Sequence, residues 1–372
     1  MSAGGPGTRL PAWADYGLVP VINLGLAFVC AGVVVVILGE SPIQALELLV
    51  AGAFGHQEAI GYTLYYATNF IFTGLAVAIA FHTGLFNIGG EGQAALGGIG
   101  LTLVCLKLGW LPLPLVFPLA FLVAALFGAL WAAIPGWLQA HRGSHVVITT
   151  IMFNFIAAAL LTYLLVNVLI KPGQSSPETE VFAQRAWLPR IHEVLGGMGI
   201  PVEPSPLNLA FVVALLLCVG FWILVWKTRF GYELRIVGRN ERAAVYGGIS
   251  PARYVVMAMA ISGALAGLMA LNEVMGSQHR LTLGFTGGYG FVGIAVALMG
   301  RNHPIGIVLA AILFGALYQG GSELAFDMPA ITRDMVVVIQ GLVILFCGAL
   351  ENLFRPRLEA LFARPATRGA AA

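Results

Sequence analysis

The sequence predicts an all-α, polytopic membrane protein. Of its 372 residues, 59% are hydrophobic and only 10% are charged, whereas a soluble domain is about 25% charged. Several apolar runs reach the length of about 20 residues that a helix needs to cross the hydrocarbon core. Within lipid, helices and closed barrels alone satisfy their own backbone hydrogen bonds, and runs of this length indicate helices.

The first apolar run extends from Leu18 to Leu38. It is too long for the hydrophobic region of a signal peptide and lacks a clear small-residue cleavage site, so we expect it to remain as the first span. The next segment, from Pro42 to Phe54, carries Glu47 and is too short to cross the membrane. Its length suits a re-entrant or interfacial helix.

Together the apolar runs predict about ten transmembrane helices. In chain order they are Val21–Leu38, Ile60–Phe81, Gln93–Leu108, Leu113–Trp137, Val147–Ile170, Leu207–Trp226, Tyr254–Met275, Phe291–Met299, Ile305–Tyr318 and Met335–Phe354. The eighth is short and begins in a glycine-rich stretch, so we expect it to be partly broken.

The distribution of Lys and Arg beside the spans predicts the orientation. Six of these residues lie in the loop 227–253 and four in the tail after Phe354, and such clusters favour the cytoplasmic side. An even number of spans then places the N-terminal segment 1–20 inside as well, and the loop 171–206 outside. The chain divides into that N-terminal segment, a transmembrane domain over 21–354 and a cytoplasmic tail over 355–372.

Composition and motifs exclude several functions. The net charge is +2 and the basic residues are scattered, which argues against nucleic-acid binding. The four cysteines lie in apolar runs without CxxC or Cys/His spacing, so neither a zinc site nor a disulfide framework is indicated. No HExxH, GxSxG or GxxxxGK[ST] sequence is present, so we predict no catalytic, metal or cofactor site in this chain. Any ATP must be used by a partner.

Two glycine-rich breaks interrupt the apolar pattern. The first is GLFNIGGEGQ, from Gly84 to Gln93, and the second covers Gly284 to Gly300 in a span of opposite direction. Transporters use such breaks to line a solute route, and two opposed breaks suggest an inverted repeat. Alternatively, the first is a cytoplasmic turn with Glu91 in an acidic first helical turn, and the aromatic residues of the second are membrane-interface anchors.

The polar loop 227–253 contains helix-forming residues between Arg239 and Tyr246. Asn240 is a suitable N-cap, and Gly247 with Gly248 is a suitable stop. We therefore predict a short surface helix that docks another protein. The alternative is that the charge of this loop merely fixes the topology.

Four segments resemble the permease family of ATP-binding-cassette importers for simple sugars and nucleosides, which is related to the branched-chain amino acid and ribose permeases. They are GLFNIGGEGQ at Gly84, VITTIMFNFIA at Val147, RFGYELRIVGRNERAAVYGGIS at Arg229 and GYGFVGIAVALMGRNHPIGIVLAAILFGAL at Gly288. The resemblance extends from about Ile60 to Phe354. It implies a permease in the cytoplasmic membrane, with two cytoplasmic ATPase subunits, a second permease subunit and an extracytoplasmic solute-binding protein as partners. It favours a heterodimer of permeases over a homodimer.

The resemblance also assigns roles to residues. The segment that couples to the ATPase contains Arg235, Gly238, Arg239, Asn240, Ala243, Ala244 and Gly247. The solute pathway is expected to involve Asn87, Glu91, Gln93, Asn154, Phe285, Tyr289 and Phe291. One departure is Val146, which follows His145 where family members commonly carry an acidic residue, so we assign His145 no role.

Two rival functions remain open at this stage. An ion- or proton-coupled secondary transporter would need titratable groups within the spans, for which Glu91 and Glu273 are the plausible carriers. A membrane scaffold that moves nothing is the second rival, although a scaffold gains nothing from costly broken helices. The sequence does not identify the solute, and the direction of transport follows from the family resemblance alone.

Overall fold

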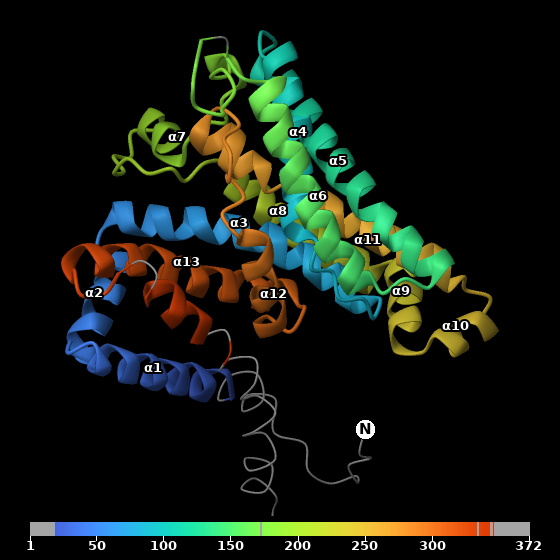
Figure 1. Cartoon of the computed structure of the whole chain (residues 1–372), viewed down its shortest axis with the longest axis horizontal. Coiled ribbons are helices and arrows are strands. Elements are labelled where there is room, and N and C mark those ends of the chain that lie inside the picture. The colour runs from blue at the N-terminus through green and yellow to red at the C-terminus, as the bar shows by residue number, and fades with distance from the viewer. Residues whose placement is uncertain (1–18, 172, 333–334, 343–344, 346–372) are drawn as a thin grey trace, which may run out of the picture. The chain divides into compact units, whose positions relative to one another are not determined.

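The computed structural model describes residues 19–171, 173–332, 335–342 and 345. Within these residues the elements are helices, joined by turns and two isolated β-bridges, which confirms the all-α prediction (Figure 1). The chain forms two compact units, one over Leu49–Gly321 and one that combines Met1–Leu48 with Ser322–Ala372. Segment 1–18, tail 355–372 and much of the tenth predicted span lie outside the described residues.

The unit formed by the two chain ends contains a bent helix pair. Helix α1 (Val19–Ile37) turns at Gly39, whose φ is +84°, into α2 (Pro42–Phe54). The pair is bent by 118°, as a broken span or a re-entrant loop would be. The predicted bounds of the short helix, Pro42 to Phe54, are therefore confirmed.

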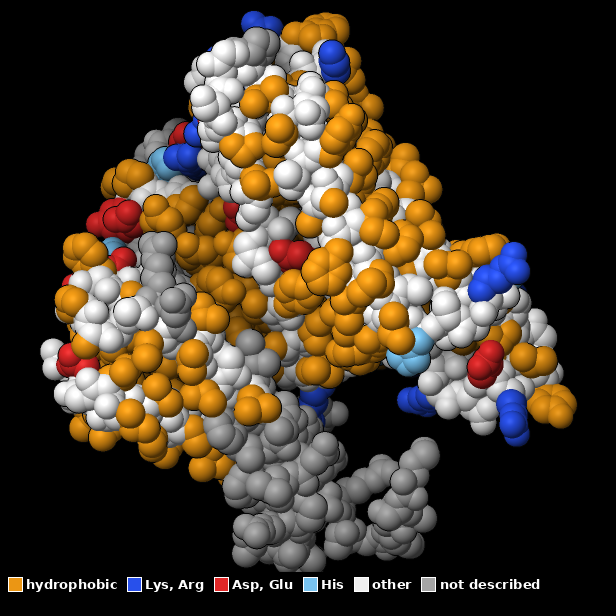
Figure 2. Space-filling model, in the orientation of Figure 1, with side chains coloured by type: hydrophobic (Ala, Val, Ile, Leu, Met, Phe, Trp, Pro, Cys, Tyr) orange, Lys and Arg blue, Asp and Glu red, His pale blue; other side chains and the backbone are white. Residues whose placement is uncertain are grey.

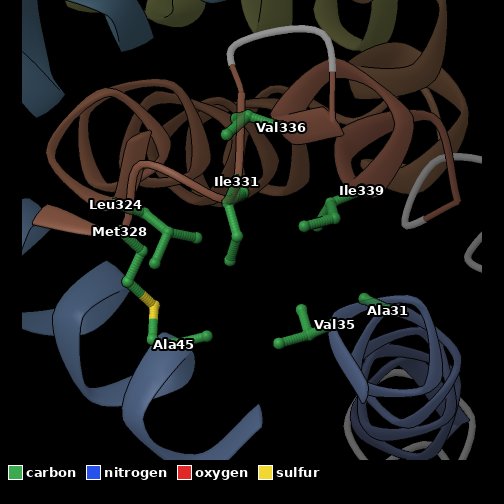
Figure 3. Close-up of a cluster of buried hydrophobic side chains, with 8 residues drawn as sticks. All are labelled: Ala31, Val35, Ala45, Leu324, Met328, Ile331, Val336 and Ile339. Atoms are coloured by element: carbon green, nitrogen blue, oxygen red, sulfur yellow. The ribbon is translucent and has the colours of Figure 1, made fainter. Parts of the chain in front are cut away.

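A hydrophobic cluster holds this unit together (Figure 3). Side chains of α1 and α2 meet side chains of the C-terminal segment, and the buried members are Ala31, Val35, Ala45, Leu324, Met328, Ile331, Val336 and Ile339. Residues 335–342 are helical, which is where the tenth predicted span begins. Burial of these apolar groups joins the described residues of the two chain ends.

The larger unit contains the remaining helices. They are α3 (Gln57–His82), α4 (Gly90–Leu108), α5 (Leu113–Arg142), α6 (Val146–Asn167), η2 (Gln184–Ala186), α7 (Ile191–Gly197), α8 (Ala210–Trp222), η3 (Ile223–Lys227), α9 (Arg229–Arg239), α10 (Glu241–Tyr246), α11 (Pro251–Gly267), η4 (Leu271–Gln278), α12 (Tyr289–Met299) and α13 (Pro304–Asp327), the last of which continues into the other unit. The segment around α7 lies at one end of the long helices α4–α6, and α9–α10 lie at the other (Figure 1).

Six helices among the described residues are long and apolar enough to cross a membrane, and the bent pair α1–α2 would make seven. Helices occupy all nine of the predicted span positions that are fully described, but α4 does not pass this test and α12 has only 11 residues. At 1.5 Å per residue, α12 covers about half of a hydrocarbon core. The described residues therefore show a multi-pass membrane fold with six or seven candidate full-length spans.

Helix α3 lies at the centre of the larger unit, because 83% of its apolar window is buried. In contrast, 22% of the corresponding windows of α5 and α6 is buried, and hydrophobic side chains cover their outward faces in Figure 2. Helix α5 packs on α11 through small residues, with Gly128 against Gly263 and Gly267. Such residues let helix backbones approach closely in lipid, and this contact fixes the helix that leads into η4.

Two π-helical segments, η3 and η4, interrupt the predicted sixth and seventh spans. Sequence periodicity does not reveal them, since a π turn adds one residue without changing the composition. Segments of this kind occur frequently at functional sites. In this chain η4 carries Asn272 and Glu273, both buried.

Candidate functional site

The first glycine-rich break joins α3 to α4 through Asn87 and Gln93. Asn87 Oδ1 accepts from the Gly89 backbone N–H at 2.8 Å and from Gln93 Nε2 at 3.1 Å. Its Nδ2 lies 3.0 Å from Gln93 Oε1 and 2.8 Å from Ser262 Oγ. Both predicted pathway side chains are buried. Their hydrogen bonds replace those that the broken helix backbone gives up.

Asn154 of α6 fixes the start of α4. Its Nδ2 donates to the Ile88 carbonyl at 2.9 Å, and its Oδ1 accepts from the Gly92 N–H at 2.9 Å. The side chain thus satisfies one free carbonyl and one of the four unpaired N–H groups of the helix N-terminus. The structure therefore brings Asn154 to the same break as Asn87 and Gln93.

Glu91 joins the first break to the second. Its two carboxylate oxygens accept from the backbone N–H groups of Gly288 and Gly290, each at 2.9 Å. These groups belong to the N-terminus of α12, where the helix dipole favours a negative charge. Glu91 lies in the first turn of α4, as the alternative interpretation of this segment expected, but its carboxylate caps a different helix.

The N-termini of α4 and α12 meet at a glycine pair. A Cβ on Gly290 would lie 2.3 Å from the Glu91 backbone nitrogen, and a Cβ on Gly90 would lie 3.3 Å from the Gly290 carbonyl oxygen. Only residues without side chains permit backbones to approach this closely. The two breaks predicted from the sequence therefore face each other and are joined by one carboxylate.

An aromatic cluster borders this junction. The ring of Tyr289 lies 5.6 Å from Phe70, 6.4 Å from Tyr66 and 6.0 Å from Tyr318, measured between centroids. The interplanar angles of 60° to 85° are typical of edge-to-face and tilted aromatic packing. Tyr289 is the first residue of α12, directly between Gly288 and Gly290, whose N–H groups Glu91 accepts. The cluster thus borders the junction through the first residue of α12.

The other two predicted aromatic residues lie elsewhere. Phe285 is 4% exposed, and its ring tip would lie 2.3 Å from a Cβ on Gly98, so it packs directly against α4. Phe291 is 49% exposed and faces away from the buried cluster. Tyr289 alone of the three belongs to the aromatic cluster.

Glu273 of η4 is the centre of a buried polar network. Its carboxylate accepts from Asn69 Nδ2 at 2.6 Å and from Gln278 Nε2 at 3.3 Å, and it also hydrogen-bonds with Tyr65. Asn272 Nδ2 donates to Asn69 Oδ1 at 2.8 Å. The π-helical geometry of η4 turns both Asn272 and Glu273 toward α3. Polar groups in membrane interiors of this kind generally serve function or hold helices together.

Sequence reasoning missed most of this cluster and network. Tyr62, Tyr65, Tyr66 and Asn69 follow the i, i+3, i+4, i+7 spacing of one helix face. That spacing of hydroxyl and amide groups within an otherwise apolar span was the available signal. Tyr318 has no comparable sequence neighbourhood, and its place in the cluster depends on how α13 packs.

The predicted surface helix is present as α10, at the end of the bundle near the C-terminus of α5. Asn240 Oδ1 accepts from the Ala243 N–H at 3.1 Å, and the Gly247 N–H donates to the Ala243 carbonyl. Ala244 is fully buried, whereas Tyr246 is 94% exposed and Val245 is 59% exposed. We refer to α9 and α10 together as the knob. Lys and Arg side chains gather there in Figure 2.

The knob touches the first break directly. A Cβ on Gly238 would lie 2.3 Å from the His82 carbonyl oxygen and 2.9 Å from the Gly84 nitrogen. Glu233 links α9 to α11 by accepting from the Tyr254 hydroxyl, and it also pairs with Arg229 within α9 at 2.7 Å. The hydrogen bond from Tyr254, followed by that from Arg229, lowers the pKa of the Glu233 carboxyl. Of the remaining predicted coupling residues, Arg239, Asn240, Ala243 and Gly247 are exposed and Arg235 is half-buried.

At the start of α6, where Val146 stands in place of an acidic residue, a side chain of α5 caps the helix. The backbone N–H of Val146 donates to Gln139 Oε1 at 2.7 Å, so an amide from the end of α5 caps the helix. His145 provides no side-chain cap. Among the described residues, no group of three or more His, Cys, Asp or Glu side chains is placed to hold a metal ion.

Comparison with known proteins gives consistent matches over most of the chain. The family model described as the branched-chain amino acid transport system permease component matches residues 59–348. A glucose ABC transporter permease protein of Haloferax volcanii is 36% identical over 362 residues, which are 96% of this chain and 94% of that protein. A guanosine ABC transporter permease protein of Bacillus subtilis is 36% identical over 336 residues, covering 89% and 93%. A nucleoside ABC transporter permease protein of Lactococcus lactis is 32% identical over 362 residues, covering 94% and 96%.

Proposed function

The chain belongs to the family of permease components of branched-chain amino acid transport systems, and we propose that it translocates a nucleoside or simple sugar as part of an ATP-binding-cassette importer. The membership agrees with the predicted transport subunit that has no ATPase site and no cofactor of its own. The observation that supports a solute route is the junction of two broken helices, with Glu91 bonded to Gly288 and Gly290. The matches favour this function over the secondary transporter and the scaffold.

The aromatic cluster supports a ring-bearing solute. Tyr66, Tyr289 and Tyr318 are half-buried, and each combines a ring face with a hydroxyl group. Aromatic faces stack on flat or apolar ring surfaces, and hydroxyl groups hydrogen-bond to polar substituents. Of the predicted pathway residues, we assign Tyr289 to solute contact. Asn87, Gln93 and Asn154 keep the broken backbone satisfied, and Glu91 holds the two breaks together.

The membrane topology belongs to the same proposal. We infer about ten membrane-inserted helices, counting α4, α12 and the C-terminal segment in addition to the full-length spans. In this arrangement the knob and both termini are cytoplasmic, and the segment 171–206 is outside. The proposed permease domain, residues 21–354, includes all of the larger unit and part of the smaller one. In this proposed topology α4 and α12 run in opposite directions from the junction of their N-termini, as an inverted repeat would require.

The α10 end of the knob is the proposed contact for a cytoplasmic ATPase. Tyr246 and Val245 form an exposed apolar tip, and Arg239 adds a charge beside it. A capped helix of six residues presents this tip in a fixed position, because Asn240 and Gly247 satisfy its ends. The other proposed partners are an extracytoplasmic solute-binding protein and a second, different permease subunit.

Reconstitution tests the function. The chain would be co-expressed with a candidate partner permease, ATPase and binding protein from the same organism, and uptake of labelled guanosine and glucose into vesicles would be measured with and without ATP. We expect ATP-dependent, saturable uptake that the unlabelled solute inhibits. Uptake that an uncoupler abolishes, but that does not depend on ATP, would contradict the proposal and favour an ion-coupled mechanism.

Tyr246→Ala tests the knob. We expect about 30-fold weaker capture of the ATPase by the purified permease, because truncation of a central aromatic side chain in an interface costs about 2 kcal/mol or more. The measurement is affinity purification in mild detergent, with quantitative mass spectrometry of the proteins that co-purify. Tyr232→Ala is the control, since Tyr232 is 58% exposed on α9 but outside α10. Equal ATPase recovery with wild type and Tyr246→Ala would refute this contact.

A further inference from the structure

A cavity lies away from the paired breaks, beside the segment 184–193. Its volume is ≈ 380 Å³, within the range of about 300–1,000 Å³ of small-molecule pockets. Its lining includes Gln184, Trp187, Arg190, Glu193 and His279. These residues come from η2, from the connection to α7, from α7 itself and from the end of η4. The cavity is therefore assembled from segments that are far apart in the sequence.

Trp187 and His279 form one wall of this cavity. Their rings stack with centroids 4.0 Å apart and an interplanar angle of 6°. Trp187 Nε1 donates to the Phe182 carbonyl at 2.9 Å, and His279 Nδ1 lies 3.0 Å from the Met275 carbonyl oxygen. Burial lowers the pKa of His279, which favours a neutral ring. Both rings are fixed before any ligand arrives, so this wall is preorganised.

The backbone conformation of His279 supports a role for this cavity in ligand binding. Its φ is +55°, in the left-handed region that a non-glycine residue rarely adopts. The surrounding hydrogen bonds hold it there, since the Phe182 N–H donates to the His279 carbonyl at 2.8 Å. Residues held in uncommon conformations occur often at ligand sites.

The polar lining offers both donors and acceptors. Arg190 takes part in neither ion pair found among the described residues, Arg229–Glu233 and Arg280–Glu178. Its guanidinium has one long contact, 3.5 Å from Nη2 to the Ser277 carbonyl. Glu193 Oε2 accepts from the Arg190 N–H at 3.1 Å. One guanidinium and one carboxylate leave the lining without net charge, which favours a neutral ligand over an anion or a cation.

We propose that this cavity is a second solute site, which binds a neutral, hydroxyl-bearing ring compound before it reaches the paired breaks. Guanidinium, carboxylate and amide groups supply planar donors and acceptors for neighbouring hydroxyl groups, and the aromatic wall packs against a ring. The inference rests on the proposed function, because the ligand class is that of the transported solute.

Backbone contacts connect the cavity to the buried Glu273 network. The Leu188 N–H donates to the Met275 carbonyl at 3.2 Å, and Arg190 contacts the Ser277 carbonyl. Both carbonyls belong to η4, the π-helical segment that carries Glu273. A ligand that shifts the 187–190 segment would therefore act on the helix that holds this network, through direct packing and hydrogen bonds.

The test is equilibrium binding of labelled guanosine and glucose to the complete transporter complex in nanodiscs, without the solute-binding protein. We expect saturable binding of one probe, weakened about tenfold in Arg190→Gln and in Glu193→Gln, because each removes a charge-assisted hydrogen bond. Arg185→Gln is the matched control, since Arg185 is exposed on η2 and does not line the cavity. Gln184→Ala is the third cavity variant. Gln184 lines the cavity at an exposed position, so its truncation should leave the fold intact.

The outcomes separate this proposal from the proposed function. Equal affinity in wild type and in all three cavity variants would overturn the second site, and so would the absence of saturable binding in a complex that transports the probe. Failure of ATP-dependent uptake with the binding protein present would instead overturn the proposed function. Weakened binding in Arg185→Gln as well would indicate a general charge effect and would also count against the cavity.

Discussion

Glu91→Gln is expected to reduce solute uptake at least about tenfold while leaving the protein in the membrane. The carboxylate accepts two backbone N–H groups at the start of α12, those of Gly288 and Gly290. A glutamine side chain has one carbonyl oxygen, so it can accept one of these and turns its NH₂ group toward the other donor. Loss of a hydrogen bond to a charged group costs about 1.5–3 kcal/mol, and about 1.4 kcal/mol corresponds to a factor of ten.

The effect should be local to the junction. We expect faster hydrogen exchange at the backbone amides of Tyr289–Met299 in Glu91→Gln, because the N-terminus of α12 loses its cap. Glu47→Gln is the matched control, since Glu47 is an exposed acidic residue of α2. Wild-type uptake together with unchanged exchange in α12 would show that the junction does not depend on this carboxylate.

The helices and the knob were predictable from the sequence because local signals determine them. An apolar run of about 20 residues has few alternatives to a helix in lipid. Asn240 and the Gly247–Gly248 pair mark the ends of α10 by capping chemistry that acts over a few residues. The bounds of α2, Pro42 to Phe54, follow similarly from the turn at Gly39 before the helix and from the length of the apolar run.

The site was less predictable because it depends on contacts between distant segments. The sequence shows that Gly84–Gln93 and Gly284–Gly300 are breaks, but not that the Glu91 carboxylate reaches Gly288. The register of η4 is also hidden, since a π-helical segment turns Glu273 to a side of the helix that 3.6-residue periodicity does not indicate. Phe291 illustrates the limit, since its ring lies outside the buried cluster although it is two residues from Tyr289.

The eighth predicted span is short in the structure because hydrophobicity does not specify helix length. Helix α12 ends at Gly300 after 11 residues, and Arg301 and Asn302 continue the turn with positive φ values. A short helix of this kind satisfies its backbone at the N-terminus through Glu91. In a continuous span, carbonyl groups of the preceding turn would accept these N–H groups; here a carboxylate from another helix accepts them.

Gly238→Leu is expected to abolish uptake while leaving membrane insertion intact. A Cβ at this position would lie 2.3 Å from the His82 carbonyl oxygen. That oxygen belongs to the backbone, so it cannot move aside as the end of a flexible side chain would. The knob and the turn at Gly84 must therefore separate, and overpacking of this kind costs about 1–3 kcal/mol. In the proposed mechanism this contact carries the motion of the ATPase to the first break, so its loss should uncouple ATP hydrolysis from transport.

A control distinguishes this uncoupling from a general effect of a larger side chain. Gly220 lies in α8 with open space around a Cβ, so Gly220→Leu should retain uptake. Uptake and ATPase activity would be measured on the same reconstituted vesicles, after size-exclusion chromatography has shown a folded, monodisperse complex. Loss of uptake with continued ATP hydrolysis would place Gly238 in the coupling route, because the ATPase subunits would still hydrolyse ATP without solute being transported. Normal uptake by a correctly inserted Gly238→Leu protein would exclude the contact between the knob and Gly84 as the link.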